Sequence, residues 1–333
     1  MGNDNPVMPT EIESRHTTTF IDAANLVAMF EADLKSLGIR VAEGSELELV
    51  SLYIMDLELR RRRESPIDEM EDIRPMWRRA VSLIETLKML HVAREQGKLK
   101  IFEPHLRLLN SSTVAQNVRA FSDDGCNKLF EMLIGLICLP IGTDVSLDDP
   151  VNSKGNNPDV MVDFDGVQWG FSCKVLNGNS PLTMFERLED GVDQIERSSV
   201  QQGVVVFNMR NLVDHDLVWP ILNEEAYRRR EETPTFRGWS NSAPVEAYLK
   251  SLSDMKHAEF VDQNGQAPID ALFRGKKALP ACLNFFQTTT SVRRVEGPAV
   301  TTIGVFGVMT FGNVTQDQMR VLQRMNASLH GMI

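Results

Sequence analysis

Cysteine is scarce in this chain of 333 residues, which contains only Cys126, Cys138, Cys173 and Cys282. None of the four lies at the C-x-x-C spacing of a zinc ribbon, so the sequence argues against a structural zinc site of that kind. Four cysteines are also too few for a disulfide framework in a protein of this size. We therefore expect a reducing compartment and a cytoplasmic location.

Long apolar runs are also lacking. The first 16 residues are polar and contain no apolar segment typical of a signal peptide. The apolar stretch at 132–141 is interrupted by Gly135 and Pro140, and no stretch reaches the roughly 20 residues that a membrane helix needs. The sequence therefore predicts a soluble protein without a membrane partner.

Positive charge is in deficit, since 35 Lys and Arg residues face 46 Asp and Glu residues, a formal net charge of −11. The overall field repels phosphate, so any contact with nucleic acid must come from a local basic patch. Two runs are the candidates for nucleic-acid binding: Arg60, Arg61, Arg62 and Arg63, and Arg228, Arg229 and Arg230. Acidic residues accompany both runs, and a solvated helix face is the favoured interpretation of each.

Two further patterns are missing. The six histidines show neither H-x-H nor H-x-x-x-H spacing, which argues against a histidine metal site or a catalytic triad. No glycine-rich phosphate-binding motif is present, which argues against a built-in ATPase.

The order of patterns along the chain predicts an α/β (α+β) protein with a mixed central sheet flanked by helices. We expect a disordered tail at 1–16, a mostly helical N-terminal region at 17–110, and an α/β core at 111–333 with a polar insertion at about 212–277. The expected helices span 17–37, 45–63, 66–96, 181–198 and 315–328, and the expected strands span 159–164, 167–176, 203–208, 281–288 and 300–311, with a polar loop at 142–157.

The most informative segment is a hairpin. Asp165-Gly166 between two apolar runs predicts a two-residue turn, because glycine tolerates the positive φ that such a turn requires. This turn places Asp163 opposite Gln168 and, further along the ladder, Asp159 opposite Ser172. Period-two alternation then puts Asp159, Ser172 and Lys174 on one face, near the open end of the hairpin.

These residues resemble the PD-(D/E)xK nuclease superfamily. The resemblance lies in Glu131 on an otherwise apolar helix, Pro158-Asp159 at the start of a strand, and Lys174 near the end of the next strand. The order helix, hairpin, helix, strand over residues 120–210 also matches, and it implies a restriction-endonuclease-like core.

One position departs from the family pattern. Ser172 stands two residues before Lys174, where the family usually has an acid. Ser172-Cys173-Lys174 resembles a subgroup of type II restriction endonucleases in which a glutamate 13 or 14 residues after the lysine supplies the missing carboxylate. That offset falls on Arg187 or Leu188 here, so the nearest acids, Glu186 and Glu189, become candidates, and the helical wheel favours Glu189.

The resemblance implies a DNA endonuclease of restriction or defence type that uses Mg²⁺ or Mn²⁺. It implies Asp159 as the central metal ligand, with Glu131, Glu189 or Glu186, and the Cys173 carbonyl completing the set. Lys174 would position or deprotonate the attacking water, and Ser172 would contribute only hydrogen bonds. Double-stranded DNA and a homodimer or larger assembly are the expected partners.

Other interpretations stay open. The loss of the acid at Ser172, together with the negative net charge, favours an inactive nuclease fold that acts as a nucleic-acid-binding or assembly module. An RNA-directed nuclease would use the same site. Asp163 is expected to pair with Gln168 at the hairpin tip, and Gln194 is expected at a solvated position on its helix.

Overall fold

A mixed β-sheet forms the centre of the molecule. The computed structural model describes residues 11–13, 17–63, 72–109, 112, 114, 124–151, 157–294 and 297–331. Strands of the sheet follow the order β2-β1-β9-β8-β6-β5-β4-β3, with β7 beside β8. Their bounds are β1 Glu11–Glu13, β2 Thr17–Thr18, β3 Thr143–Leu147, β4 Val160–Phe164, β5 Val167–Val175, β6 Gln202–Asn208, β7 Gly238–Trp239, β8 Ala278–Arg294 and β9 Gly297–Thr310. Strand β6 runs parallel to β5 and β8, whereas β3–β4, β4–β5 and β8–β9 are antiparallel.

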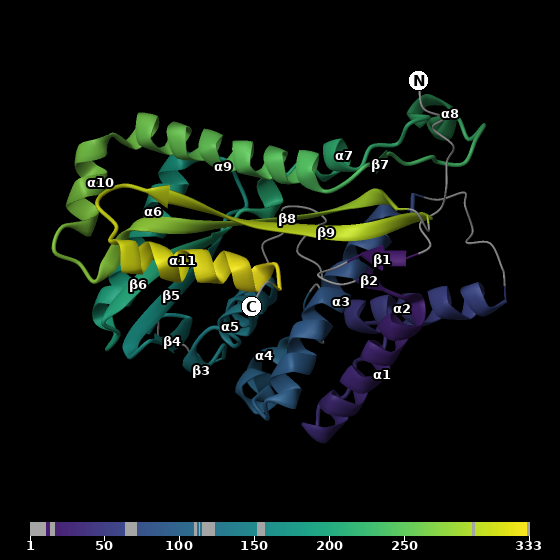
Figure 1. The fold of residues 1–333 in the computed structure, drawn as a ribbon, viewed down its shortest axis with the longest axis horizontal. Helices are drawn as coiled ribbons and strands as arrows, with labels where there is room; N and C mark the ends of the chain where they lie inside the picture. The colour runs from purple at the N-terminus through teal and green to yellow at the C-terminus, as the bar shows by residue number, and fades with distance from the viewer. Residues whose placement is uncertain are drawn as a thin grey trace.

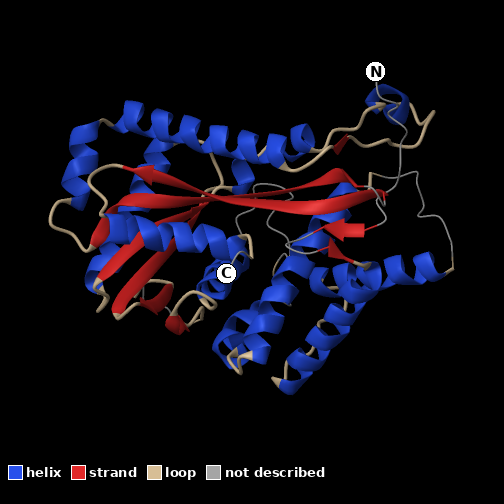
Figure 2. Ribbon diagram, viewed as in Figure 1, coloured by secondary structure: helices blue, strands red, loops and turns tan. Residues whose placement is uncertain are grey.

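Helices cover the sheet on both sides (Figures 1 and 2). Their bounds are α1 Phe20–Ser36, α2 Glu46–Arg62, α3 Arg74–Glu95, α4 Glu103–Leu108, α5 Asp124–Cys138, α6 Pro181–Arg197, α7 His215–Val218, α8 Glu224–Arg228, α9 Ala243–Asn264, α10 Gln266–Phe273 and α11 Gln316–Leu329, with short 3-10 turns η1 Leu99–Phe102 and η2 Arg210–Leu212. The predicted α/β class, with a mixed sheet flanked by helices, is confirmed. None of the described helices combines the length and apolar character needed to cross a membrane.

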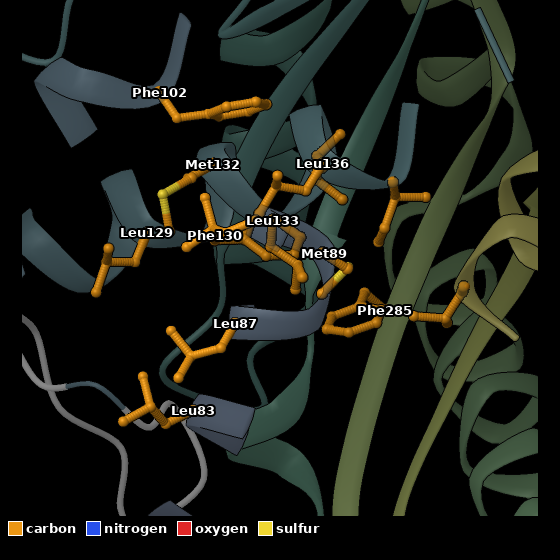
Figure 3. Packing of buried hydrophobic residues seen from close by; sticks show 14 of the residues in the cluster. Leu83, Leu87, Met89, Phe102, Leu129, Phe130, Met132, Leu133, Leu136 and Phe285 are labelled. Carbon is orange, nitrogen blue, oxygen red and sulfur yellow. The ribbon is translucent and has the colours of Figure 1, made fainter. Parts of the chain in front are cut away.

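Alternation along the strands divides the interior into two apolar cores. On β6, Val204 and Val206 belong to the first core, and Val205 and Phe207 to the second. The first core also takes the buried faces of α1, α2, α3, α5 and α11. Figure 3 shows part of it, where Phe130 of α5 stacks on Phe285 of β8 with ring centroids 5.7 Å apart. The second core takes the buried faces of α6, α9 and α10.

The hairpin that carries the candidate site has the predicted register. Asp163 pairs with Gln168 and Val160 with Phe171. Asp165 and Gly166 have φ values of 56° and 85°, which is the left-handed backbone of a two-residue hairpin turn. The apolar side chains Val160, Val162, Phe164, Trp169 and Phe171 all lie in the first core, as the alternation predicts.

Several expected boundaries were wrong. Strand β3 lies inside the predicted loop at 142–157, because this edge strand is short, carries a bulge and buries few side chains. Strand β8 spans Ala278–Arg294, so it begins before and ends after the predicted strand at 281–288. Within the region 212–277, predicted as a polar insertion, the structure forms the 22-residue helix α9.

The predicted tail also differs from the structure. Of residues 1–16, those described are 11–13, which form β1 and pair with β9. The remaining residues of the predicted tail lie outside the described part of the chain.

Candidate active site

Asp159 stands where the main-chain pairing of the hairpin ends. The ladder between β4 and β5 begins at Val160 and Phe171, so Asp159 lies one residue beyond the end of the ladder. Asp159 Oδ2 accepts a hydrogen bond from the Cys173 backbone nitrogen at 2.6 Å. Pro158 before it lacks an N–H and cannot extend the ladder. The aspartate is 5% exposed, so its carboxylate is held in the interior by a main-chain donor.

Gln194 of α6 joins the polar groups of the two strands. Its Oε1 accepts hydrogen bonds from Ser172 Oγ at 2.6 Å and from Lys174 Nζ at 2.9 Å. Its Nε2 donates to Asp159 Oδ1 at 3.3 Å and to the Asn157 carbonyl oxygen. The side chain is buried, so the expected solvated position was wrong. Asp159, Ser172 and Lys174 therefore meet on one face as predicted, and Gln194 connects them.

Glu131 approaches the site from α5 and is also buried. Lys128, one turn earlier on the same helix, donates to Glu131 Oε1 at 2.7 Å. His105 of α4 places Nε2 3.5 Å from Glu131 Oε2, and His105 is 1% exposed. Within the described residues, Glu131 Oε2 has no hydrogen-bond partner.

Two buried carboxylates make the site electrostatically unusual. Burial, followed by the negative charge of Glu131, raises the pKa of Asp159 to about 6. Lys174, the Cys173 backbone N–H and Lys128 oppose this shift only partly. Burial disfavours the charge of Lys128, but Glu131 outweighs it, and the pKa of the ammonium is raised. Raised carboxyl pKa values of this kind gather at functional sites, although structural ion pairs also cause them.

The predicted substitute acids lie elsewhere on α6. Glu186 and Glu189 are both exposed. Glu189 lies five residues before Gln194, about 140° around the helix, so the two positions face different directions. The face of α6 toward the sheet is set by Met184, Leu188, Val192 and Ile195, which lie in the second core. The helical wheel favoured Glu189, but Glu189 points away from the site. The side chain of α6 that reaches the site is the neutral amide of Gln194.

The two arginine runs lie on exposed helix ends beside acids. Arg61 and Arg62 both contact Glu58, and hydrogen bonds from these two guanidinium groups lower the pKa of Glu58 to about 2. Arg228 and Arg229 pair with Glu224 and Glu231. These pairs match the interpretation of solvated helix faces. Among the described residues, Asp159 and Lys174 make their hydrogen bonds to Cys173 and Gln194, and not to either arginine run.

The donor set fits a magnesium ion held by two carboxylates. Mg²⁺ is often bound by one or two carboxylates, with waters and substrate phosphates completing its coordination. Asp159 and Glu131 provide two buried carboxylates of like charge, and one Glu131 oxygen lacks a hydrogen-bond partner among the described residues. The described part of the chain contains no group of three or more His, Cys, Asp or Glu side chains placed to hold a metal ion. The residues therefore do not fit a cage of three or more such side chains.

Sequence reasoning missed Lys128 and His105 and misplaced Gln194. Lys128 had a usable signal, because a lysine three residues before a glutamate on a helix is a neighbour of it. His105 had no such signal, since α4 and α5 meet only through tertiary packing.

Comparisons of the chain with protein-family models, with curated proteins and with solved structures find no match.

Proposed function

We propose that the chain is a Mg²⁺-dependent DNA endonuclease of restriction or defence type. The observation that carries the proposal is the contact of buried Gln194 with buried Asp159 and half-buried Lys174, close to the buried Glu131. A lysine and a carboxylate at the end of a hairpin, with a second carboxylate from α5, can hold a metal ion, activate a water and offset charge in the hydrolysis of a phosphodiester. Burial of two acids of like charge is costly to a structural site and is understandable in a functional one.

The order of elements supports the proposal independently. Helix α5 carries Glu131, strands β3 to β5 carry Asp159 and Lys174, and α6 and β6 follow. This order agrees with the helix, hairpin, helix, strand pattern on which the resemblance to PD-(D/E)xK nucleases rests. The parallel pairing of β5 with β6 also places α6 as a crossover helix across the strand that carries Lys174.

Each side chain has a role that its contacts allow. Asp159 and Glu131 would hold Mg²⁺, which supplies an activated water and offsets charge on the phosphate. Lys174 would orient the attacking water or take its proton, and its ammonium would offset charge in the transition state. Gln194 holds the Lys174 ammonium in place through Oε1. Ser172 donates to the same oxygen, so it is a positioning residue rather than a metal ligand.

A second candidate is an inactive nuclease fold that binds nucleic acid or serves in assembly. It is favoured by Ser172, a neutral side chain where the resemblance would place an acid, and by Gln194, a neutral amide that contacts the site from α6 while Glu186 and Glu189 are exposed. The ion pair of Lys128 with Glu131 also favours it, because a lysine already compensates one of the two carboxylates. This candidate predicts binding without cleavage.

A cleavage assay separates the two. Purified protein is incubated with supercoiled plasmid, linear duplex DNA, single-stranded DNA and RNA in Mg²⁺, Mn²⁺ or EDTA. We expect metal-dependent cutting of duplex DNA that falls on the order of 10²-fold or more in Lys174→Ala and Asp159→Asn. Lys250→Ala, an exposed lysine on α9, is the matched control and should cut normally.

The folding of each variant is checked by circular dichroism and its melting temperature. Cutting that persists in folded Lys174→Ala would refute the assignment of the site. Duplex DNA that is shifted in a gel but never cut, with any metal, would select the binding protein instead. Cutting of RNA alone would keep the site and change the substrate.

A further inference from the structure

An apolar stripe lies on the outward face of α2. Leu49, Leu52, Met55 and Leu59 are 53%, 59%, 39% and 46% exposed. The opposite face of the same helix is apolar too and is buried in the first core through residues such as Ile54. A helix that is apolar on both sides normally has a neighbour on both sides. In the described structure, α2 has a neighbour on the inner side only.

The stripe has the spacing of a helix-pairing seam. Leu49, Leu52, Met55 and Leu59 follow one another in steps of 3, 3 and 4 residues, which keeps the four side chains on one side of the helix, where a partner helix can pack. Figure 1 shows α2 at the edge of the molecule, with its C-terminal end projecting past α1 and α3. The four side chains of the stripe are exposed, so a second helix can reach them.

Charge is divided between the two ends of the stripe. Glu43 and Glu48 lie at the N-terminal end, and Arg60 and Arg63 at the C-terminal end. Arg60 also pairs with Asp56 of the same helix. With this pair included, the two ends of the stripe still carry opposite charge, so α2 is complementary to a reversed copy of itself. In a parallel pair, arginines would instead face arginines and glutamates would face glutamates.

We propose that α2 pairs antiparallel with α2 of a second copy of this chain, in a dimer with twofold symmetry. The twofold axis then crosses the outer face of α2 at the level of residue 54. Leu49 lies opposite the partner's Leu59, and Glu48 lies close to the partner's Arg60. Twofold symmetry repeats each of these contacts. The proposal does not depend on the proposed nuclease activity.

The size of the stripe sets the expected strength. A helix of 17 residues is about 25 Å long. One stripe on it is smaller than the roughly 800 Å² that each partner of a standard complex buries. We therefore expect a reversible dimer with a dissociation constant in the micromolar range, whose population rises with protein concentration.

Light scattering on a size-exclusion column, with sedimentation velocity over a concentration series, tests the surface. The full chain should move from monomer to dimer as concentration rises. Leu52→Glu/Leu59→Glu should stay monomeric over the same range and keep the melting behaviour of a folded protein. Met255→Glu is the matched control, because Met255 is 47% exposed on another helix, and it should dimerise like the parent.

Crosslinking tests the orientation. Leu49→Cys and Leu59→Cys variants are mixed and oxidised mildly with oxidised glutathione, beside the parent chain as the background control. The antiparallel pair predicts a disulfide between the two different variants and little within either alone. The proposal would be overturned by any of three results: a parent chain that is monomeric at all concentrations, a dimer that Leu52→Glu/Leu59→Glu does not weaken, or disulfides that form within each variant alone.

Discussion

Gln194 is the side chain through which α6 acts on the candidate site. It accepts from Ser172 and Lys174 with one atom and donates to Asp159 and the Asn157 carbonyl with the other. All of its amide hydrogen-bonding groups are therefore used inside the protein. Its neighbours demand one acceptor and one donor at this point, which an amide supplies and a carboxylate does not.

Replacing this amide by an acid tests the donor set. In Gln194→Glu, one oxygen still accepts from Lys174, but the other faces the oxygens of Asp159 and Asn157. We expect a loss of roughly 1–3 kcal/mol in the free energy of unfolding without metal. We also expect Mg²⁺ to raise the melting temperature of Gln194→Glu more than that of the parent, because a third carboxylate joins the site. Thermal melts with and without Mg²⁺ measure both effects.

Gln194→Leu is the control for that variant. It removes the same amide and adds no charge, so it should be destabilised without gaining a response to Mg²⁺. Equal Mg²⁺ shifts in the two variants would mean that position 194 is not beside a cation site.

His215 is a second residue whose surroundings control its protonation. Its Nδ1 lies 2.9 Å from Thr288 Oγ1, next to Arg78 and Arg210. Burial, followed by the charge of Arg78, lowers the pKa of His215 to about 4. Nearby Asp216 opposes the shift only in part. The imidazole is therefore neutral in the folded protein at pH values above about 4.

This shift predicts a dependence of stability on pH. Between pH 4 and 6.5 the unfolded chain binds a proton at His215 that the folded chain does not, so stability falls as pH drops through this window. At a pH near 4.5 the loss amounts to about 2 kcal/mol. Urea unfolding at this pH and at pH 7 should show a smaller difference for His215→Gln than for the parent.

The raised pKa of Asp159 acts in the opposite direction, because the folded state then binds the additional proton. The contribution of Asp159 is the same in the parent and in His215→Gln, so it cancels when their stabilities are compared. The same pH dependence in His215→Gln and the parent would show that this histidine is not responsible.

At the scale of elements, the close approach of α6 to the sheet is what brings Gln194 to the strands. Gly191 makes this approach possible. A Cβ atom at Gly191 would lie 2.7 Å from Val205 Cγ2 and 3.2 Å from Ser172 Oγ. Any larger residue would have to move α6 away from β5 and β6, and Gln194 would move with it.

Gly191→Ala should therefore damage both stability and the site. Overpacking costs roughly 1–3 kcal/mol, more than the approximately 1 kcal/mol that alanine returns through helix propensity. We expect a lower urea midpoint and weaker cleavage. Gly178→Ala is the matched control, because a Cβ at Gly178 meets no atom within 4 Å. A Gly191→Ala variant as stable as Gly178→Ala would contradict the role given to this contact.

At the scale of the whole molecule, the N-terminal helices and the sheet share one core. The first core runs without a break from Ile54 of α2 and Trp77 of α3 to Phe130 of α5 and Phe285 of β8. Residues 17–109 therefore lack a separate apolar interior among the described residues. The helical region supports the layer that presents Glu131, and His105 is the side chain that its described residues contribute to the site.

A shared core predicts a shared unfolding transition. Ile54→Ala should cost about 2–5 kcal/mol and shift the unfolding of the entire chain. Far-ultraviolet circular dichroism and tryptophan fluorescence should both move, with coincident midpoints. Two separated transitions, with only the first one shifted, would show instead that the N-terminal helices unfold on their own.

The sequence by itself determined what depends on near neighbours along the chain. Asp165-Gly166 specified a turn, the turn specified the register, and alternation then placed Asp159, Ser172 and Lys174 on one face. These steps succeed because turn chemistry and strand periodicity act over a few residues. Ser45 and Thr315 also cap their helices locally, as side-chain acceptors for α2 and α11.

Only the tertiary structure decided which groups meet those strands from elsewhere. The apolar residues of α6 in the second core, with the close approach of Gly191 to Val205, bring Gln194 rather than Glu189 to the site. Likewise, the contacts of Lys128 and His105 with Glu131 need α4 and α5 in place. Such choices follow from packing between distant segments, which periodicity within one segment does not encode.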